Sequence, residues 1–423
     1  MPAHFQIPLD LPDIDITSVR DGEQGALILE VKSTLTSTHC RQCHRPISAF
    51  HGYDRPVRLQ HLPIFERKVF IELRPKRYRC HDCDGRPTTT QQLSWYSPNC
   101  PHTHALDQWL LKRLVNSTVS DASICCQVGY DAVEGCIDRH VDKTIDWQQV
   151  APFATLGLDE ISLRKGHQNF VCVVTALNSE GRVMVLAILP DRRKQTVLDF
   201  LLSIPVAFKQ GIERVCSDMY DGFINAAKEA LPGVEVVIDR FHVAKNYNKG
   251  VDDFRKATLK NLKQDLPKAT YDTLKGSMWA FRRHFWDLKE TQVARLMELF
   301  AHAPELKQAW LLRHELFLIY QAAYTPAQAE EDINAWIQKV RTSKLTCFDG
   351  FIQQLDASRT DILAYFNGRY TSGFVEGLNN KLKVIKRRCF GLLDAGKLFQ
   401  RIQIDLQART GLFSIRQNTT CCV

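Results

Sequence analysis

The sequence has no long apolar run and no recognisable leader. Its 423 residues are 44% hydrophobic and 24% charged, as in a soluble globular protein. No stretch of about 18 apolar residues is present, so neither a membrane-spanning helix nor a membrane partner is predicted. The opening residues, MPAHFQIPLDLPDID, lack the basic and then apolar segments of a secretory signal. We therefore expect a cytoplasmic protein.

A large excess of charge is also missing, since the net charge is only +8. The basic residues are nevertheless unevenly placed. Residues 55–86 contain nine Lys or Arg against four acids, and residues 381–401 contain seven against one. Two local basic patches on an otherwise balanced chain favour a nucleic-acid partner. The length alone predicts several domains.

Fourteen cysteines are present, but a reducing compartment excludes a disulfide framework for them. Four of them form two C-x-x-C pairs, Cys40 with Cys43 and Cys80 with Cys83. Two such loops can close a tetrahedral four-thiolate zinc site, which has no open position and is therefore structural. Four free cysteines are the alternative. Possible substitute ligands are His44, His81 and Cys100.

The N-terminal third also carries signals of DNA binding. Between the two cysteine pairs lies a basic segment with Tyr78 interleaved, a pattern that suits phosphate contacts. Its basic residues are Arg74, Lys76, Arg77 and Arg79. Helical apolar spacing follows from Leu106 to Leu114, then a short helix from about Ser120, a turn at Gly129 and a helix over 130–141. This order is typical of a helix-turn-helix, although any small three-helix bundle shares it.

From residue 156 the pattern changes to short runs rich in Val and Ile. It predicts three meandering strands (155–158, 170–176 and 182–189), a helix (194–202), a strand (214–217), a helix (220–230) and a strand (235–238). This is the order of elements in ribonuclease H. In that order the first and fourth strands are neighbours, so Asp159 and Asp218 should meet at adjacent strand ends. Asp239 follows the last strand in the same way.

The stretch 371–388, TSGFVEGLNNKLKVIKRR, predicts a basic amphipathic helix. Its apolar stripe is Leu378, Leu382, Ile385 and Cys389. Glu376 lies about 200° around the axis from Leu378, so it should point away from that stripe. Three carboxylates, Asp159, Asp218 and Glu376, could hold two divalent ions that activate a nucleophile and stabilise the leaving oxygen of a phosphodiester. The alternative is a first-turn Glu favoured by the helix dipole beside a solvated basic face.

These motifs resemble the DDE transposases of bacterial insertion sequences, specifically the ISL-three group. The resemblance extends over nearly the whole chain. It rests on Asp159-Glu160 with Lys165-Gly166-His167, on Ser217-Asp218-Met219-Tyr220, on Asp239-Arg240-Phe241-His242, and on Glu376-Gly377-Leu378-Asn379-Asn380 with Lys383 and Lys386-Arg387. It implies that Asp159, Asp218 and Glu376 are the catalytic triad, with a ribonuclease H-like fold and the terminal inverted repeats of the element as substrate. Asp239 and His242 are second-rank catalytic candidates, and a capping Asp with a packed His is an equal alternative for them.

The expected fold is therefore multidomain α+β. It comprises a zinc-binding module (1–100), a helix-turn-helix domain (101–150), a ribonuclease H-like mixed α/β catalytic domain (151–244), an all-helical insertion (245–370) and the C-terminal helices of the catalytic domain (371–423). Six aromatic residues of the insertion are expected to form its core, with stacking on unpaired bases as the minority alternative. They are Trp279, Phe281, Phe285, Trp286, Trp310 and Trp336.

The expected function is DNA cleavage and strand transfer by a mechanism that uses two Mg²⁺ ions, for which Mn²⁺ can substitute. A separate Zn²⁺ is expected to have a structural role. The expected partners are the terminal inverted repeats and target DNA, bound by a homodimer or larger assembly associated with the bacterial nucleoid. The second group of DNA-binding candidates is Lys383, Lys386, Arg387 and Arg388. We also expect the fragment 1–150 to bind the element ends. Alternatives are an inactive or domesticated copy that only binds DNA, and a nuclease or resolvase without strand transfer.

Overall fold

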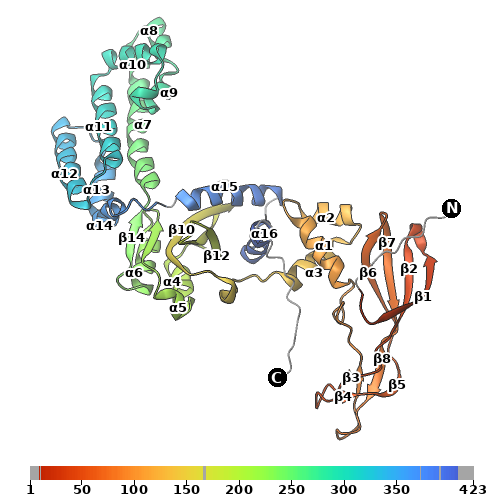
Figure 1. The fold of residues 1–423 in the computed structure, drawn as a ribbon. Coiled ribbons are helices and arrows are strands. Elements are labelled where there is room, and N and C mark those ends of the chain that lie inside the picture. Colours follow the sequence, from red (N-terminus) through yellow and green to blue (C-terminus); the bar gives the residue numbers. More distant parts are fainter. Residues whose placement is uncertain (1–8, 10, 165–167, 372, 390–391, 408–423) are drawn as a thin grey trace. The chain divides into compact units, whose positions relative to one another are not determined.

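The computed structural model describes residues 9, 11–164, 168–371, 373–389 and 392–407 (Figure 1). The chain divides into two compact units. The first unit contains residues 1–143, 385–392 and 396–423, and the second contains residues 144–384 and 393–395. Among the described residues no helix is long and apolar enough to cross a membrane.

The first unit begins with β-structure. A four-stranded sheet has the order β1-β2-β7-β6. Its strands are β1 (Ile14–Asp21), β2 (Leu27–Ser33), β6 (Val57–Ile64) and β7 (Arg67–Leu73). Alternation in β7 places Val69, Ile71 and Leu73 in the core, at no more than 2% exposure. Two smaller sheets pair β3 (Thr38–His39) with β4 (Pro46–Ile47), and order β5 (Ala49–Tyr53), β8 (Lys76–Arg79) and β9 (Thr88–Thr90) as β5-β8-β9.

Three short helices complete the N-terminal part of the first unit: α1 (His104–Leu114), α2 (Val119–Cys126) and α3 (Tyr130–His140). Thr103 caps α1 by accepting from the backbone N–H of Leu106, and Thr118 forms a reciprocal capping box with Asp121. The α16 helix (Ala395–Gln407) packs on them, because Ile404 is fully buried in the core that α1, α2 and α3 share. A C-terminal helix thus joins the helices predicted as a helix-turn-helix.

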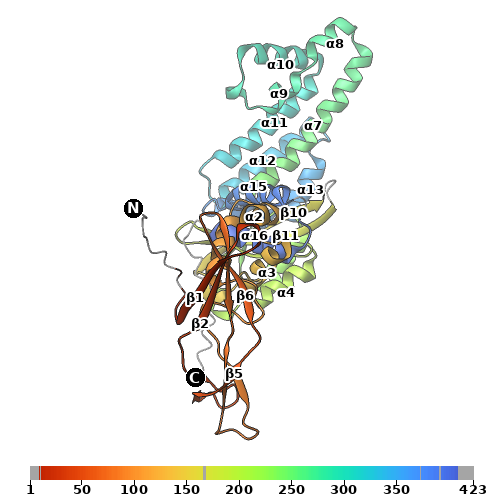
Figure 2. The ribbon, with the colours of Figure 1, turned by 90° about the vertical axis from the view of Figure 1, so that its right-hand side faces the viewer.

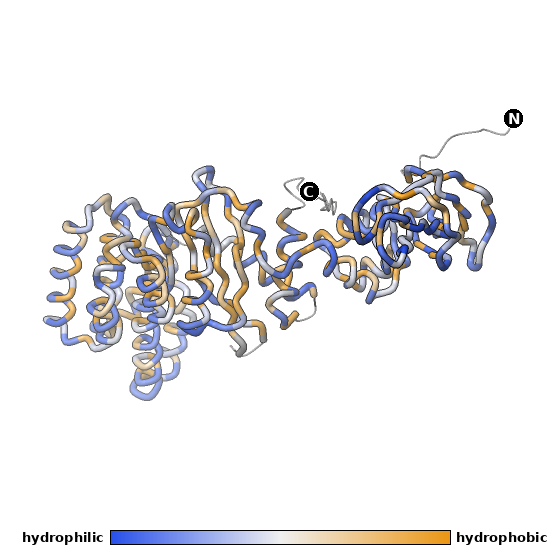
Figure 3. The backbone as a smooth tube through the Cα atoms, turned by 90° about the horizontal axis from the view of Figure 1, so that it is seen from below, coloured by the Kyte–Doolittle hydropathy of each residue, from blue (hydrophilic) through white to orange (hydrophobic). Residues whose placement is uncertain are grey.

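The second unit is built on a five-stranded sheet with the order β12-β11-β10-β13-β14. Its strands are β10 (Phe153–Arg164), β11 (Gln168–Asn178), β12 (Val183–Leu189), β13 (Arg214–Ser217) and β14 (Glu235–Ile238). The first three are antiparallel, whereas β13 pairs in parallel with both β10 and β14. The strands carry many of the apolar segments of this unit (Figure 3). The connecting helices are α4 (Lys194–Ser203), α5 (Val206–Lys209) and α6 (Asp221–Ala230).

Two paired strands are longer than predicted, since β11 covers residues 168–178 where 170–176 were expected, and β10 differs more. The predicted first strand stops before Asp159, but β10 continues to Arg164. It continues because the antiparallel pairing with β11 extends past the point where β13 ends, from Asp159 opposite Val173 to Ser162 opposite Phe170. Asp159 therefore lies within a strand and at the end of its parallel pairing.

Helices occupy most of the chain from 240 to 366, as predicted. They are α7 (Arg240–Asp265), α8 (Lys268–Leu274), α9 (Ser277–Arg282), η3 (Phe285–Asp287), α10 (Glu290–His302), α11 (Pro304–Gln321), α12 (Pro326–Ser343), α13 (Asp349–Ala357), α14 (Arg359–Leu363) and η4 (Ala364–Phe366). The α7 and α11 helices run side by side (Figure 2). The predicted aromatic core is correct for Phe281, Trp310 and Trp336, which are buried. It is wrong for Trp279, Phe285 and Trp286, which are 62%, 52% and 57% exposed.

Candidate active site and metal centre

Two aspartates meet where parallel strands of the second unit stop pairing. Leu158 of β10 lies opposite Ser217 of β13, so Asp159 and Asp218 are the next residues on neighbouring strands. Oδ1 of Asp159 accepts the backbone N–H of Glu160 at 2.7 Å, and Oδ1 of Asp218 accepts that of Tyr220 at 3.0 Å. The strand pairing places the two aspartates side by side, as the predicted order requires, and a backbone N–H holds one oxygen of each.

Burial and nearby charges act on both carboxylates. Burial raises the pKa of Asp218 to about 6, opposed by the Tyr220 N–H and His242, while Asp159 and Glu160 raise it further by repulsion. Burial also raises the pKa of Asp159, and the Glu160 N–H, His242 and Lys383 oppose this. Burial and mutual repulsion thus disfavour the ionised forms of both carboxylates, and a bound cation would offset both effects.

The α15 helix (Gly373–Arg388) contributes an amide to this pair. Nδ2 of Asn379 donates to Oδ2 of Asp159 at 2.5 Å. Asn379 is only 5% exposed, and no hydrogen-bond partner for its Oδ1 is found among the described atoms. The sequence reasoning missed this role, although Asn379 adjoins Leu378 at the edge of the buried stripe.

The predicted apolar face of α15 is confirmed for Leu378, Leu382 and Ile385, which are 9%, 0% and 1% exposed, whereas its last member, Cys389, is half-buried. Glu376 lies in the first turns of the helix, but its side chain is outside what the structure describes. The Lys165-Gly166-His167 motif lies outside the described residues as well. The third predicted carboxylate therefore stays a prediction.

Asp239 and His242 lie at the start of α7. Asp239 is 5% exposed and caps the helix, because Oδ1 accepts the backbone N–H of Phe241 at 3.1 Å. Its own N–H donates to the Ser217 carbonyl at 2.9 Å, which ties the cap to β13. His242 lies close enough to lower the pKa of both Asp159 and Asp218. Asp239 therefore caps α7, as one of the two interpretations of this residue expected. A catalytic role for Asp239 stays a prediction.

An arginine steadies the other side of the carboxylate pair. Nη1 of Arg192 donates to Oε2 of Glu160 at 2.6 Å. The same guanidinium stacks over the rings of Phe170 and Tyr220 at 4.7 and 5.1 Å. Sequence reasoning gave no signal for this residue, because its partners are distant in the chain.

The four predicted zinc ligands come together in the first unit. The sulfurs of Cys40, Cys43, Cys80 and Cys83 all lie within 4.8 Å of one another. The Cys40–Cys83 and Cys43–Cys80 sulfur distances are 3.9 and 3.8 Å. A tetrahedral site with Zn–S bonds of about 2.3 Å requires sulfur separations of about 3.8 Å, so the cluster fits zinc.

The thiols of this cluster also have the electrostatics of a cation site. Backbone N–H groups of Cys43 and Gln42 point at the Cys40 sulfur and lower the pKa of that thiol to about 6. Hydrogen bonding to the Cys43 thiol, together with burial, raises the pKa of Cys83 to about 12. Crowded sulfurs cannot all ionise until a cation joins them.

The predicted DNA-binding residues differ in how available they are. Arg74 is exposed, whereas Arg77 donates to Thr88 at 2.6 Å and Arg79 hydrogen-bonds to His51 at 2.9 Å. Lys76 donates to the Leu35 carbonyl at 2.8 Å. Tyr78, which is interleaved among them, is 2% exposed and packs in the zinc module.

The candidates on α15 differ in the same way. Lys383 and Arg387 are exposed and Lys386 is half-buried. Arg388 instead pairs with the buried Asp405 at 2.7 Å, which commits it to holding α15 against α16 within the first unit.

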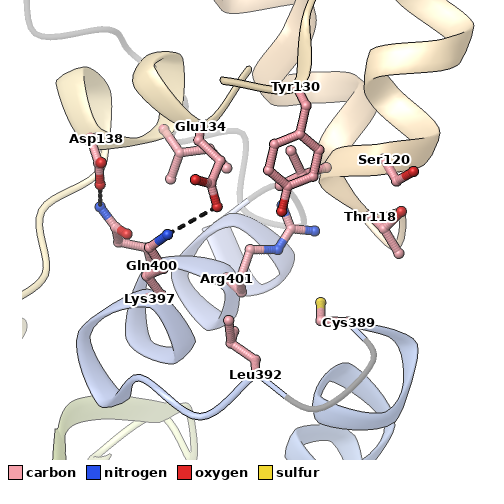
Figure 4. Close-up of a pocket in the computed structure, with 12 residues that line it drawn as sticks. Thr118, Ser120, Tyr130, Glu134, Asp138, Cys389, Leu392, Lys397, Gln400 and Arg401 are labelled. Carbon is pink, nitrogen blue, oxygen red and sulfur yellow. Dashed lines mark hydrogen bonds and ion pairs between the residues drawn. The ribbon is translucent and has the colours of Figure 1, made fainter. Parts of the chain in front are cut away.

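The α16 helix forms hydrogen bonds with the turn between α1 and α2 and with the end of α3. Nη2 of Arg401 donates to the carbonyls of Leu114 and Ser117 at 3.0 and 2.5 Å, and Asp405 accepts the N–H of Asn116 at 3.0 Å. Gln400 donates to Asp138 and to the Val141 carbonyl at the end of α3. The same region lines a pocket between α16 and the helices α2 and α3 (Figure 4).

A second titratable cluster links α1 to α3. Burial opposes the ionisation of Asp107, but hydrogen bonds from His102, His140 and Arg139 hold its pKa well below the usual range. Asp107, Cys136 and His140 offer atoms within 4.8 Å of one another. Arg139, however, donates to both oxygens of Asp107 at 3.1 and 2.9 Å. The cluster is therefore an ion-pair network, with a cation already supplied by the chain.

The two units together define a multidomain protein with a four-thiolate module and a carboxylate site on a mixed sheet. Residues 156–402 match a family model described as "Transposase", that of the ISL3 DDE transposases. Residues 36–83 match the model described as the zinc-finger of transposase IS204/IS1001/IS1096/IS1165. The chain belongs to the ISL3 (ISL-three) family of DDE transposases, and its four-cysteine cluster is the zinc ribbon of that family.

Relatives extend over nearly the whole chain. The transposase for insertion sequence element IS1001 of Bordetella parapertussis is 29% identical over 383 residues, which are 89% of this chain and 91% of the relative. The transposase for IS1557 of Mycobacterium tuberculosis is 22% identical over 434 aligned positions, covering 96% of this chain and 95% of the relative. A chain of the Drosophila P element transposase strand transfer complex matches 72% of this chain and 91% of its own length with a TM-score of 0.38 and 9% identity.

Proposed function

We propose that the protein cuts DNA at the ends of its own insertion sequence and joins the freed ends to target DNA, using Asp159, Asp218 and Glu376. The observation that carries this proposal is the pairing of Leu158 with Ser217, which makes Asp159 and Asp218 neighbours. The sheet order β12-β11-β10-β13-β14 supports a ribonuclease H-like fold, in which the first and fourth strands are adjacent. Family membership supports the reaction class.

The donor set suits Mg²⁺. Carboxylate oxygens are the ligands that this ion prefers, and the burial that raises the pKa of Asp218 to about 6 would be offset by a cation. Two ions held by the triad would supply an activated attacking oxygen and a stabilised leaving oxygen. No covalent intermediate with the protein is part of this proposal.

Other residues of the chain prepare the triad. Asn379 donates to Oδ2 of Asp159 and the Glu160 N–H donates to Oδ1. These two hydrogen bonds hold the Asp159 carboxylate in one orientation. Arg192 neutralises Glu160, which adjoins the pair, by an ion pair of 2.6 Å. His242 favours the ionised forms of both aspartates. We assign these side chains positioning roles.

The first unit would recognise the ends of the element. A zinc ribbon with basic strands and a three-helix group of helix-turn-helix order are suited to phosphate and groove contacts, respectively. Two element ends must be brought together before joining, so a homodimer or larger assembly on DNA is part of the proposal. Target DNA is the second substrate.

Substitution of Asp218 by Asn tests the function. The assay uses the full chain, Mg²⁺ and labelled duplexes that end in the inverted repeats flanking the gene. Loss of an ion ligand forfeits several kcal/mol, so cleavage should fall by roughly 10³-fold or more while end binding persists. Glu376→Gln should behave in the same way, and Asp239→Asn should lose less. Parental cleavage by Asp218→Asn or Glu376→Gln would reject the triad.

An inactive copy gives a different result. The parental protein would then bind the inverted repeats and leave them intact with both Mg²⁺ and Mn²⁺. A nuclease or resolvase would cut the ends and release them without joining them to a second DNA.

A further inference from the structure

The helical insertion displays a stack of rings on its surface. Trp286 lies nearly parallel to His284, with ring centroids 5.1 Å apart and an interplanar angle of 6°. The His284 ring in turn contacts the Phe317 ring of α11 at 3.9 Å. These three residues, His284, Trp286 and Phe317, are called the aromatic platform below. Trp286 is 57% exposed and the adjacent Phe285 is 52% exposed, and grouped large apolar side chains at a surface mark a binding site.

Two arginines lie near the aromatic platform. The Arg240 guanidinium lies over the Phe317 ring at 5.4 Å. Arg313 is buried beneath, where its guanidinium donates to the Arg283 carbonyl at 3.0 Å. Burial and these two arginines lower the pKa of His284, and Asp287 opposes them. Flat rings among arginines suit a ligand that is both aromatic and anionic, which describes a nucleotide better than an apolar peptide.

The aromatic platform is continuous with the proposed cleavage site. Arg240 is the first residue of α7 and directly follows Asp239, whose backbone is bonded to Ser217 beside Asp218. His242, two residues further on, acts electrostatically on both Asp159 and Asp218. The first turn of α7 therefore acts electrostatically on the carboxylate pair through His242 and contacts the aromatic platform through Arg240.

We propose that the aromatic platform stacks on an unpaired nucleobase of the DNA end held at the carboxylate pair. A base inside a duplex already has neighbours on both faces, whereas a base released beside the cleavage point exposes a face that Trp286 can cover. Stacking is tolerant of sequence because every base has a π face. This inference rests on the proposed function, since it places the DNA end at Asp159 and Asp218.

The test compares two DNA probes with the full chain carrying Asp218→Asn, so that no probe is consumed. One probe is a blunt duplex of the element end, and the other continues into three unpaired nucleotides at the cleavage point, the first being 2-aminopurine. Trp286→Ala should weaken binding of the second probe by about 5- to 100-fold and leave the blunt probe unchanged, as expected for the loss of one stacked base. The 2-aminopurine fluorescence, quenched by the parental stack, should recover in this variant.

Two variants control for folding and for general loss of aromatic surface. Trp286→Phe should keep most of the affinity, since a ring remains. Trp279→Ala removes a tryptophan of the same insertion that is 62% exposed, and should change neither affinity. Equal losses on both probes, an effect of Trp279→Ala as large as that of Trp286→Ala, or no effect at all would overturn the inference.

The outcome can be separated from that of the proposed function. The ratio of the two affinities requires no cleavage, whereas the triad is judged only by cleavage in an otherwise parental chain. Cleavage that depends on Asp218 together with an unchanged affinity ratio would reject the aromatic platform alone.

Discussion

Removal of α16 should disable DNA recognition, although this helix lies far along the chain from the helices it supports. Ile404 is fully buried in the core shared by α1, α2 and α3, and replacing a buried Ile by Ala costs about 2–5 kcal/mol. Deleting the whole helix also removes Arg401 and Asp405, which satisfy backbone groups of the turn between α1 and α2. Because a domain is stable by only about 5–15 kcal/mol, the loss exceeds the margin of this small group. The fragment 1–150 lacks α16, so we no longer expect it to bind the element ends.

The measurement uses the full chain, Ile404→Ala and a truncation after Asp394. Urea unfolding followed by hydrogen exchange should show earlier exchange in α1, α2 and α3 of Ile404→Ala, with the strands β10 to β14 unchanged. The truncated chain should lose specific binding to element ends. It should keep its zinc, because the four cysteines belong to a different hydrophobic core from that of Ile404.

A control on the same helix makes the result specific. Lys397 pairs with Glu134 at 3.0 Å, but both side chains are partly exposed, at 40% and 32%. Lys397→Ala should therefore cost no more than about 1 kcal/mol and leave binding intact. End binding by the truncated chain with the parental affinity would refute the idea that α1, α2 and α3 need α16 to bind DNA.

Three further outcomes are expected. The purified protein should hold about one zinc per chain, Cys80→Ser should lose it and the exposed Cys125→Ser should not, as measured by elemental analysis; retention of zinc by Cys80→Ser would contradict the site. Asn379→Ala should lower the cleavage rate by about 10- to 100-fold with unchanged end binding, whereas its exposed neighbour Asn380→Ala should not, and equal rates would contradict a positioning role. Because hydrogen bonds depress the pKa of buried Asp107, the stability it confers is present above the pKa of an unfolded Asp, about 3.9, and is lost as pH falls from about 5 toward 2. Asp107→Asn should cost about 3–5 kcal/mol at pH 7 and flatten this acid dependence in unfolding experiments, and an unchanged slope would count against it.

The short parallel strands could be predicted from sequence alone. The segments 214–217 and 235–238 are runs that are buried on both faces, and their limits coincide with β13 and β14. The extent of β10 could not be predicted, because among the described residues its second half pairs with β11 alone. Periodicity identified the buried stripe of α15 but not the partner of its edge residue Asn379.

Periodicity also fails to predict whether an apolar helix face is buried, because it does not show what packs on that face. Trp286 and Trp336 stand at equally helix-compatible positions, yet one is 57% exposed and the other fully buried. The same limit hid the place of α16, whose contacts with α3 bridge 259 residues of chain. At the candidate active site, the sequence predicted Asp159 and Asp218 as neighbours from strand order, whereas Arg192 depends on contacts that no spacing encodes.

The distance along the chain between α3 and α16 has a consequence for biosynthesis. The hydrogen bond from Gln400 to the Val141 carbonyl joins residues 259 positions apart, and ribosomes add about 5–20 residues per second. The helices α1, α2 and α3 must therefore wait on the order of ten seconds or more for α16, while the strands of the second unit are made. Ribosome-bound chains arrested before residue 395 should consequently fail to capture an element-end duplex that released chains bind. Under the proposed function, binding to an element end would therefore begin only after the strands β10 to β14 have been made.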